Sequence, residues 1–360
     1  MIYWNRFHDH TGGQPLGVTI SDVAREAGVG VGTVSRVLNN SPRVSEATRE
    51  RVLAVMRELD YVPNPFARRL SLGRSLTVAV IVPFFTRPSF VERLRGVEAA
   101  IAQTEYDLVL YNVETVEKRN QCFLQVPRRE RVDGLLVLSL APSDDHAAHF
   151  QRSGVPTVLI DAEHPELPSL AVDDAAGGRL AARHLIDLGH RRIAFVGDTY
   201  PNPFNFTSSY RRYVGCQEAL HGAGLLVHRE YYAMGEHACD VARQLTRKLL
   251  DLPEPPTAVV AASDTQAIGV LEAARDRGIS IPHDLSVVGY DDIEVASYLN
   301  LTTVRQPLFE SGWRGTHLLF HVIGGSAAGK PQEDLPVELV VRGTTAPPGN
   351  GRASRKRRNP

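Results

Sequence analysis

Hydrophobic positions along the chain change their spacing near residue 75, and this change divides the sequence into two parts. Before it, apolar residues recur every three or four positions, as they do along one face of a helix. The spacing predicts three short helices, over residues 20–27, 31–38 and 46–59. Thr19 and Ser45 are suited to cap the first and third of these helices, and Gly28 follows the first. We therefore expect a small all-α domain at residues 18–62, with only a small core.

The part after residue 75 has the pattern of a parallel α/β protein. The apolar runs LTVAVIV, DLVLYNV, VDGLLVLSL, PTVLI, RIAFVG, TAVVAA and LSVVGY are predicted strands. Helical spacing separates them, for example over residues 175–188, 208–221, 240–250 and 264–277. Strands that are apolar almost throughout are buried on both faces, as in a parallel sheet that helices cover on each side. About 265 residues are many for one such unit, so we expect two doubly wound lobes with a cleft between them.

Between these parts lies a segment, residues 63–75, that we expect to be a linker. Asn64 is suited to an N-cap, Pro65 to the first helical position, and Gly73 to the far end, so they frame one short helix. A helix this short does not persist alone in water, so it should order only when something supports it. Residues 1–17 and 346–360 show no periodicity, and we expect a flexible lead and a disordered basic tail.

Composition excludes several classes of protein. With 43% hydrophobic and 22% charged residues, the chain has enough apolar material for a core, which excludes wholesale disorder. No apolar run approaches the roughly 18 residues of a membrane-spanning helix. The start, MIYWNRFHDH, lacks the apolar stretch of a secretory signal. The 3 cysteines lie far apart, against a disulfide framework or a structural zinc site. We expect a cytoplasmic protein with no metal and no cofactor.

Charge is distributed unevenly, although the net charge is only −1. Residues 1–75 hold 10 Arg or Lys against 7 Asp or Glu, and residues 342–360 hold 6 against none. The long middle part is correspondingly acidic. Only the two ends of the chain therefore have the positive charge that nucleic-acid binding requires.

The first two predicted helices, with Ala27-Gly28-Val29-Gly30 between them, have the layout of a helix-turn-helix. In that layout the second helix enters the major groove of DNA with its N-terminal end. Arg36 is suited to guanine, and Val31 to a thymine methyl group. Thr33, Ser35 and the backbone N–H groups of residues 30–32 suit phosphate oxygens. A plain helical hairpin with a solvated polar face would show the same periodicity.

The residue types from 18 to 70 distinguish between these two interpretations, which periodicity alone does not. VTISDVAREAGVGVGTVSRVLNN, followed by YVPNPFARRL, closely resembles the DNA-binding domain of the lactose-repressor (LacI/GalR) family of bacterial transcription regulators, over about fifty consecutive positions. The resemblance implies base contacts from Val31 and Gly32, with Arg36 and Asn39 also in the major groove. It implies positioning contacts from Thr19, Thr33, Ser35, Tyr61 and Asn64. Ala67 would line the linker helix, and Leu70 would be the wedge that two paired linkers insert into the minor groove.

Two glycines depart from the family pattern. Gly30 removes the hydroxyl that usually caps the recognition helix, and Gly32 offers no side chain to a base. We expect operator affinity to depend more on DNA shape and on the linker helix.

The resemblance continues to about residue 345, through HLIDLGHRRIAFVGD, AASDTQAIGVLEAARDRG, SVVGYDDIEVA, LTTVRQP and ELVVRGTT. It implies an effector-binding and dimerisation core, residues 76–345, similar to periplasmic sugar-binding proteins. The expected lobes are residues 76–161 with 292–323, and 162–291 with 324–345. By position, the effector candidates are Phe84, Phe85, Phe90, Asp161, Phe204, Arg212, Ser263, Asp264 and Asp291. Carboxylates, an arginine fork and aromatic faces suit a polyol.

The function expected from these features is a homodimeric repressor. Its affinity for a pseudo-palindromic operator would be controlled by a small effector between the lobes, with a carbohydrate as the class that the resemblance favours. One alternative is an α/β small-molecule-binding or hydrolytic protein with a vestigial DNA-binding domain. Another is a helical protein-interaction module. The effector, the sign of the response and the operator sequence are not readable from the chain.

Overall fold

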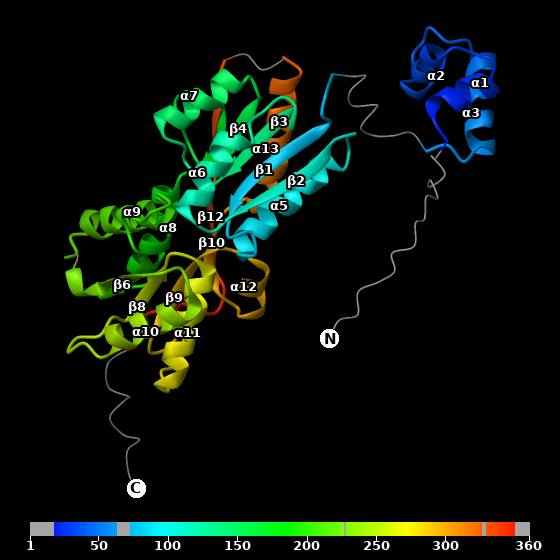
Figure 1. Cartoon of the computed structure of the whole chain (residues 1–360). Coiled ribbons are helices and arrows are strands. Elements are labelled where there is room, and N and C mark those ends of the chain that lie inside the picture. The colour runs from blue at the N-terminus through cyan, green and yellow to red at the C-terminus, as the bar shows by residue number, and fades with distance from the viewer. Residues whose placement is uncertain (1–17, 63–72, 227, 326–328, 350–360) are drawn as a thin grey trace, which may run out of the picture. The chain divides into compact units, whose positions relative to one another are not determined.

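The computed structural model describes residues 18–62, 73–226, 228–325 and 329–349. It divides the chain into two compact units, Met1–Arg74 and Ser75–Pro360, which are described here one by one (Figure 1). The predicted linker helix, with Asn64, Ala67 and Leu70, lies outside the described residues, as do the predicted lead and most of the predicted tail.

The first unit is a three-helix domain with bounds close to those predicted. Its helices are α1 (Ile20–Glu26), α2 (Val31–Leu38) and α3 (Glu46–Glu58). Thr19 and Asp22 form a reciprocal capping box at the start of α1, and Gly28, at φ +64°, makes the turn toward α2. Val23, Val34 and Val52 are fully buried at the centre of the small core. The apolar positions that the helical spacing predicted therefore form the core that holds the three short helices together.

The second unit contains two six-stranded sheets, each the centre of one lobe (Figure 1). The first sheet is parallel throughout, in the order β11-β5-β4-β3-β1-β2. Its strands are β1 (Thr77–Pro83), β2 (Asp107–Val113), β3 (Gly134–Leu138), β4 (Thr157–Ile160), β5 (Ser169–Val172) and β11 (Gln332–Leu335). The helices packed on it are α5 (Pro88–Ile101), α6 (Val116–Gln125), α7 (Asp144–Ser153) and α13 (Leu308–Ile323).

The second sheet has the order β12-β10-β9-β8-β6-β7, and only the edge strand β12 is antiparallel to its neighbour. Its strands are β6 (Ile193–Asp198), β7 (Tyr232–Gly235), β8 (Ala258–Ala261), β9 (Ser286–Asp291), β10 (Thr302–Arg305) and β12 (Glu338–Val340). Its helices are α8 (Asp174–Asp187), α9 (Ser208–Gly222), α10 (Cys239–Leu250), α11 (Asp264–Asp276) and the short α12 (Glu294–Tyr298), with a 3-10 turn at Arg229–Tyr231. The predicted fold class, two doubly wound lobes after a helix-turn-helix domain, is confirmed.

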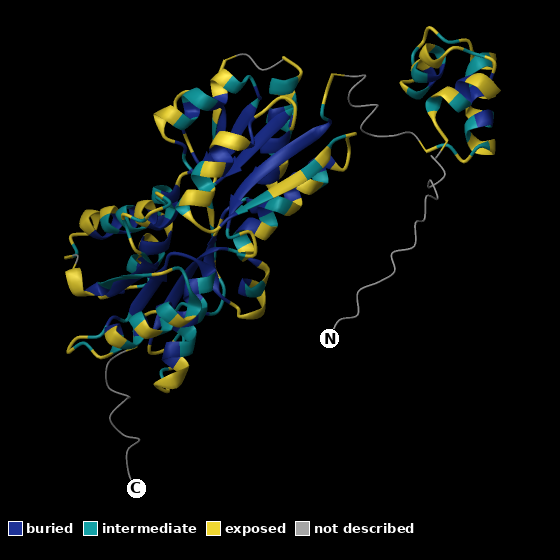
Figure 2. Cartoon of the chain, viewed as in Figure 1, coloured by how far each residue is buried: buried dark blue, intermediate teal, exposed yellow. Residues whose placement is uncertain are grey.

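Both sheets are buried on their two faces, as Figure 2 shows by the dark strands between helices with exposed outer sides. Apolar clusters cover each face of each sheet. All of β1 is buried, whereas in the edge strand β2 three residues are exposed, three are half-buried and only Val113 is buried. This difference explains why the central strands read as continuous apolar runs.

The predicted bounds of the two lobes are wrong at three short strands. β5 and β11 belong to the first sheet, although residues 162–291 and 324–345 were expected in the second lobe. β10 belongs to the second sheet, although residues 292–323 were expected in the first. Each of these strands has only 4 residues. The sequence of a four-residue strand does not indicate which of the two sheets the strand will join.

Glycines set the distance between the helices that carry the cleft arginines. A Cβ atom at Gly312 in α13 would lie 2.0 Å from the carbonyl oxygen of Arg93 in α5. A Cβ atom at Gly178 in α8 would lie 1.9 Å from the carbonyl oxygen of Arg212 in α9. The two helix pairs therefore pack backbone against backbone. This close packing fixes the backbone positions from which the side chains of Arg93 and Arg212 extend. Among the described residues, no helix combines the length and the apolar character needed to cross a membrane.

Candidate functional site

The exposed side of α2 carries the residues that the sequence predicts for DNA contact. Val31 is 42% exposed, and Gly32, Arg36 and Asn39 are also exposed. Thr33 and Ser35 are half-buried, because they stand beside the core positions of the helix. Within the part of the chain that the structure describes, the side chain of Arg36 has no hydrogen bond or ion pair. Its guanidinium is therefore available to a partner outside the domain.

The ends of α2 differ in how they are held. Gly30, the N-cap residue, provides no side-chain hydrogen bond, as expected from a glycine. At the other end, Arg49 of α3 donates to the side-chain oxygen of Asn40 at 2.8 Å and to the carbonyl oxygen of Ser41 at 2.8 Å. A cation at a helix C-terminus complements the helix dipole. The first turn of α2 is thus left open, while its last turn is tied to α3.

Thr19 and Tyr61, two further candidates, lie in the same domain. The hydroxyl of Thr19 donates to Asp22 Oδ2 at 2.7 Å, and this hydrogen bond lowers the pKa of Asp22. Tyr61 packs against the domain core, and its burial raises the pKa of the phenol. Both side chains therefore have structural contacts within the domain.

The cleft of the second unit lies where strands of the two sheets end. Residues at the carboxyl ends of β1, β3, β4 and β9 have left-handed backbone: Phe84 (φ +43°), Ser139 (φ +53°), Asp161 (φ +58°) and Asp291 (φ +113°). Non-glycine residues adopt such angles rarely, and they cluster at ligand sites. In an open α/β sheet, ligands bind outside the carboxyl ends of the strands.

An inner compartment of the cleft, about 70 Å³ in volume, is bordered by both lobes. Its lining residues are Arg87, Ser89, Phe90, Arg93, Ser139, Asp161, Asp198, Phe206, Ser208, Ser209, Arg212, His237, Ala262, Ser263, Asp291 and Gln306. The structure thus brings together five of the predicted residues: Phe90, Asp161, Arg212, Ser263 and Asp291. Three arginines and three aspartates line this compartment, so its fixed charges balance.

A chain of hydrogen bonds crosses the inner compartment from one lobe to the other. Arg93 Nη2 lies 3.0 Å from Asp161 Oδ1 and donates to Gln306 Oε1 at 2.9 Å. Gln306 Nε2 in turn donates to Asp291 Oδ1 at 2.5 Å. Ser139 Oγ donates to the other oxygen of Asp161, also at 2.5 Å. Arg93 is 2% exposed, and its Nε has no hydrogen-bond partner, so one donor in the cleft remains unused.

Arg212 is the buried cation of the second lobe. Its Nε donates to Asp174 Oδ1 at 2.8 Å, and its Nη1 donates to the carbonyl oxygen of Ala262 at 2.6 Å. The guanidinium lies 3.6 Å from the centre of the Tyr290 ring and 3.5 Å from Asp291 Oδ1. Burial by itself lowers the pKa of Arg212, but the nearby negative charges, Asp174 first, outweigh burial and raise it. Arg212 is therefore a permanent charge that is held in one orientation.

Asp264, although predicted to contact the effector, is directed away from the cavity. Its two carboxylate oxygens accept hydrogen bonds from Thr303 Oγ1 at 2.6 Å and from the Ile293 backbone N–H at 2.9 Å. Burial, followed by the charge of Asp291, raises its pKa well above the usual range. These contacts join α11 to the strand β10 and to the loop after β9. Asp264 therefore holds the loop that begins directly after Asp291.

A strap, residues 199–207, passes from the second lobe to the first. The ring of Phe204 makes an edge contact with Phe84 at 5.3 Å and stacks on Phe206, also at 5.3 Å. Arg119 of α6 is 3.4 Å from the carbonyl oxygens of Pro203 and Phe204, to which it donates. Of the three phenylalanines, Phe206 lines the cavity. Phe84 instead packs against Phe204 of the strap, and Phe85 is 40% exposed.

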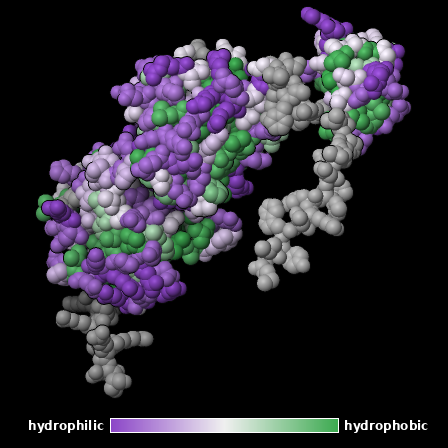
Figure 3. All heavy atoms as spheres, in the orientation of Figure 1, coloured by the Kyte–Doolittle hydropathy of each residue, from purple (hydrophilic) through white to green (hydrophobic). Residues whose placement is uncertain are grey.

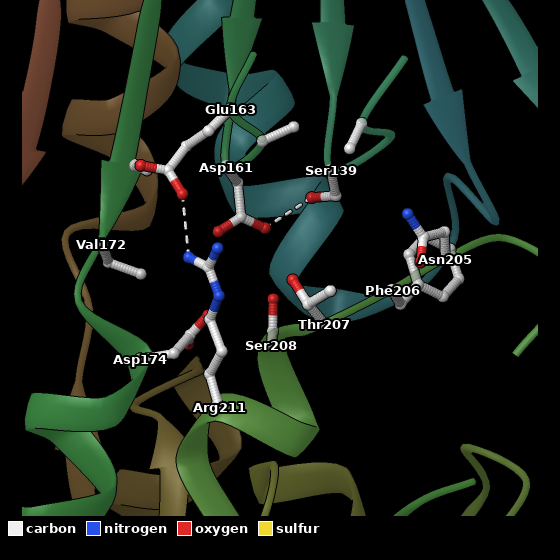
Figure 4. Close-up of a pocket in the computed structure, with 13 residues that line it drawn as sticks. Ser139, Asp161, Glu163, Val172, Asp174, Asn205, Phe206, Thr207, Ser208 and Arg211 are labelled. Atoms are coloured by element: carbon white, nitrogen blue, oxygen red, sulfur yellow. Dashed lines mark hydrogen bonds and ion pairs between the residues drawn. The ribbon is translucent and has the colours of Figure 1, made fainter. Parts of the chain in front are cut away.

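An outer compartment of about 210 Å³ continues the cleft (Figure 4). It shares Ser139, Asp161, Phe206 and Ser208 with the inner one, so the two are parts of one cavity. Its other lining residues are Ala141, Ala162, Glu163, Ala171, Val172, Asp174, Asn205, Thr207 and Arg211. Figure 4 shows Arg211 rising from α9 toward Glu163, which it reaches at 2.8 Å.

Comparison with known proteins identifies both units. Residues 19–64 match the family described as bacterial regulatory proteins, lacI family, and residues 182–345 match the periplasmic binding protein-like domain. The HTH-type transcriptional repressor CytR of Escherichia coli (strain K12) is 33% identical over 336 residues, 92% of this chain and 97% of the relative. The chain belongs to the lacI family of bacterial regulatory proteins.

Other members of the lacI family are similarly close. The ribose operon repressor of Escherichia coli (strain K12) is 36% identical over 331 residues, 91% of this chain and 99% of the relative. The lac repressor dimer bound to operator and the anti-inducer ONPF has 30% identity and a TM-score of 0.81, over 91% of this chain and 99% of that one. The resemblance expected from the sequence is confirmed, and so is the expected function class. The protein is a DNA-binding repressor that responds to a ligand.

Several residues of the cleft were not predicted. Arg93, Ser139 and Gln306 connect predicted residues to one another, and Asp198 pairs with His237 at 3.2 Å on the second lobe. Arg93 could have been recognised most easily, because it shares the apolar face of α5 with Phe90 and Val97, and a charge at such a position needs a partner. Gln306 lies in LTTVRQP, which marked the family but gave no indication of a contact.

Proposed function

We propose that an uncharged, polyhydroxylated small molecule binds in the cleft and controls how tightly this repressor binds its operator. The observation that carries the proposal is the chain Asp161–Arg93–Gln306–Asp291, which presents hydrogen-bonding groups of both lobes to one cavity. A ligand that bonds to Asp161 on one side and to Arg212 or Asp291 on the other stabilises the arrangement in which the lobes are close. The balance of arginines and aspartates favours a neutral ligand over an ionic one.

For the cleft, the proposed effector contacts are Phe90, Asp161, Arg212, Ser263 and Asp291, with Arg93, Ser139 and Phe206 added from the geometry. Phe84, Phe85 and Phe204 are proposed to shape the cavity through the strap. Asp264 is proposed to position Asp291 and not to touch the ligand.

On the DNA side, we propose that α2 enters the major groove. Arg36 would bind guanine and Val31 a thymine methyl group, while Gly32 and Asn39 would lie against neighbouring base edges. Thr33, Ser35 and the open first turn of α2 would bind phosphates. Thr19, Tyr61 and Asn64 would orient the domain on the duplex, and Ala67 and Leu70 would act from the linker, residues 63–75.

We also propose a homodimer that forms through the first lobe. β2 is an edge strand that exposes Val109 (38%) and Leu110 (37%), and Val91 of the neighbouring α5 is 40% exposed. Hydrophobic atoms gather over this edge in Figure 3. An apolar surface on an edge strand is a ready interface for a second copy of the chain. Two copies would present two recognition helices to a pseudo-palindromic operator.

The protein is further proposed to act in the cytoplasm and to have no enzymatic activity. Both Asp161 and Asp291 in the inner compartment are already engaged, Asp161 with Arg93 and Ser139, and Asp291 with Gln306 and Arg212. Groups held in this way bind and orient a ligand and are not free to exchange protons with it.

The experiment that tests the DNA assignment is fluorescence anisotropy with the full chain and labelled DNA from upstream of its own coding sequence. Arg36→Ala should weaken specific binding by about 1–3 kcal/mol, because it removes a bidentate base contact. Arg57→Ala, at an exposed position of α3, serves as the matched control and should leave specific binding nearly unchanged. Leu70→Ala should reduce DNA bending and affinity together. Equal affinities in all four proteins would overturn the assignment of α2 to the groove.

A further inference from the structure

The first lobe carries a group of arginines far from the cleft, in the loop between α6 and β3. Three of the four residues 128–131, here called the arginine loop, are arginine, and all four are exposed. Val126 and Val132 on either side are buried in the core of the lobe. The backbone N–H groups of Arg131 and Val132 both donate to the carbonyl oxygen of Arg128, at 2.8 and 3.0 Å. The arginine loop is thus a tight turn that is anchored at both ends.

Two of its arginines are without a partner in the described part of the chain. A Cβ atom at Gly154, the C-cap residue of α7, would lie 2.6 Å from Arg129 Nη2, so the guanidinium of Arg129 rests on the end of that helix. The side chains of Arg128 and Arg131 have no hydrogen bond or ion pair with any residue that the structure describes. Glu130 is the one carboxylate of the loop. The loop therefore has a net positive charge, and two of its guanidinium groups are available to an anion from outside the protein.

The arginine loop adjoins the point where the chain enters the first lobe. Asp133, two positions after Arg131, accepts hydrogen bonds from the backbone N–H groups of Ser75 and Leu76, both at 2.9 Å. The hydroxyl of Ser75 donates to the same carboxylate at 3.0 Å. Ser75 is the last residue of the linker, residues 63–75. The arginine loop is therefore fixed next to the end of the linker.

Two acidic residues at this end of the sheet lie on the other side of β1. Glu105 precedes β2 and Asp107 begins it, and β2 pairs with one edge of β1. β3, which follows the arginine loop, pairs with the other edge of β1. Strands two places apart in a sheet are about 10 Å from each other. Exposed charges at that distance are largely screened at physiological salt, so these carboxylates do not cancel the charge of the loop.

The length of the chain brings the arginine loop within reach of operator DNA. The proposed function places Leu70 in the minor groove, and five peptide steps separate Leu70 from Ser75. Five residues span at most about 18 Å, whatever their conformation. Duplex DNA carries one negative charge per about 1.7 Å of its axis, so about ten phosphates lie within that length. Because Ser75 is held this close to the groove, the arginines beside it lie near phosphates of the same site.

We propose that Arg128 and Arg131 bind phosphates of the operator beside the linker. The inference rests on the proposed function, in which the linker occupies the minor groove. The lobe that borders the cleft would then contact DNA itself, in addition to the helix-turn-helix domain and the linker. Phosphate contacts position a protein on the duplex and do not read bases, so the arginine loop adds affinity without adding sequence preference.

The salt dependence of operator binding tests the proposal on the full chain. Each phosphate contact adds about one to the slope of the logarithm of the association constant against the logarithm of salt concentration. The double variant Arg128→Gln with Arg131→Gln should make this slope shallower by about two for each protomer bound, and should weaken binding about tenfold at about 0.1 M salt. Fluorescence anisotropy with labelled DNA from upstream of the coding sequence, from about 50 to about 300 mM potassium chloride, measures both.

Two further double variants separate a phosphate contact from a change in structure or in overall charge. Arg128→Lys with Arg131→Lys keeps both charges and should retain most of the slope, because a lysine also binds phosphate. Arg183→Gln with Arg229→Gln removes two exposed arginines of the second lobe, whose side chains also have no partner among the described residues. This matched control should bind the operator with the slope of the unmodified chain.

Three results would overturn the proposal. The glutamine pair in the arginine loop could bind with an unchanged slope, the lysine pair could lose as much slope as the glutamine pair, or the control pair in the second lobe could lose as much. Arg36→Ala in the same assay distinguishes these failures from a failure of the proposed function. If Arg36→Ala weakens specific binding while the arginine loop has no effect, the proposed function stands and only the loop contact is wrong. If Arg36→Ala and Leu70→Ala both bind as the unmodified chain does, the proposed function itself is wrong.

Discussion

At the scale of single residues, Arg212 shows how a charge can be kept inside a protein. Asp174, Asp291, the carbonyl oxygen of Ala262 and the face of Tyr290 surround it, so its burial is compensated on every side. Removing the cation would leave the buried carboxylates of Asp174 and Asp291 without its compensating charge, which costs much more than the pair itself contributes. Its neighbour Arg211 forms an ion pair with Glu163 that is exposed to solvent. The two adjacent arginines therefore form a natural comparison.

Arg212→Ala should lower the free energy of unfolding by about 3–5 kcal/mol at pH 7, and Arg211→Ala by less than about 1 kcal/mol. Burial raises the pKa of Asp291, and the positive charge of Arg212 opposes that rise. Without Arg212 the folded-state pKa of Asp291 rises further above its unfolded value. The contribution of Asp291 to stability is then largest below the unfolded pKa and is lost as the pH rises through the folded pKa.

Urea denaturation at pH 5 and pH 8 checks this, with a larger deficit for Arg212→Ala expected at about pH 8 than at about pH 5. A deficit that is the same at both pH values, or equal for the two arginine variants, would contradict the assigned role of Arg212.

At the scale of elements, the strap is the feature that joins the lobes near the cleft. Residues 199–207 leave the second sheet after β6, pack Phe204 and Phe206 against the first lobe, and return to α9. Asn202 holds the loop in shape, because its side chain donates to the carbonyl oxygen of Phe206 at 2.8 Å and accepts from the backbone N–H groups of Phe204 and Phe206. Through Phe206 this loop forms part of the cavity wall.

Phe204→Ala should loosen the strap by removing its ring contacts with Phe84 and Phe206. We expect amide hydrogen exchange over residues 199–207 to become about tenfold faster, while exchange in β6 and α9 stays the same. Phe309→Ala is the matched control, since Phe309 is a 43% exposed phenylalanine of α13 and its loss should leave exchange in the strap unchanged. Hydrogen exchange with mass spectrometry on the full chain measures this. Unchanged exchange in Phe204→Ala would show that other contacts hold the strap.

At the scale of the whole molecule, the proposed dimer links the cleft to DNA. β2 and α5 lie on the first lobe, and α5 also carries Arg93, which lines the cleft and pairs with Asp161 there. A change in the cleft that moves α5 would therefore alter the surface between two copies of the chain. This gives a physical route from the effector to the spacing of the two recognition helices.

Leu110→Arg places a charge in this surface and should shift the protein from dimer to monomer at micromolar concentration, because an unpaired buried charge is costly at an interface. Operator affinity should fall with it, since one protomer reads half of the site. Leu124→Arg, at a 49% exposed position of α6, is the control and should remain dimeric. Analytical ultracentrifugation distinguishes these states, and a Leu110→Arg variant that sediments as a dimer would place the interface elsewhere.

The sequence by itself determined the parts of this protein that depend on neighbouring residues. The helices of the first unit follow from Thr19, Gly28 and Ser45, whose capping and turn preferences act over three or four positions. The strands of both lobes follow from continuous apolar runs. Asp161, Arg212 and Asp291 could be selected because strand ends and family motifs mark them, and the structure brings all three to one cavity.

Only the tertiary structure decided which side chains complete the cleft and which sheet each short strand joins. Arg93 and Gln306 are separated by 213 positions in the chain, yet they share a hydrogen bond. Asp264 is adjacent to Ser263 in sequence, yet it turns inward to Thr303 while Ser263 lines the cavity. Capping and periodicity act within a few residues. The pairing of distant side chains and of four-residue strands depends instead on how whole helices and sheets pack, which a local pattern does not contain.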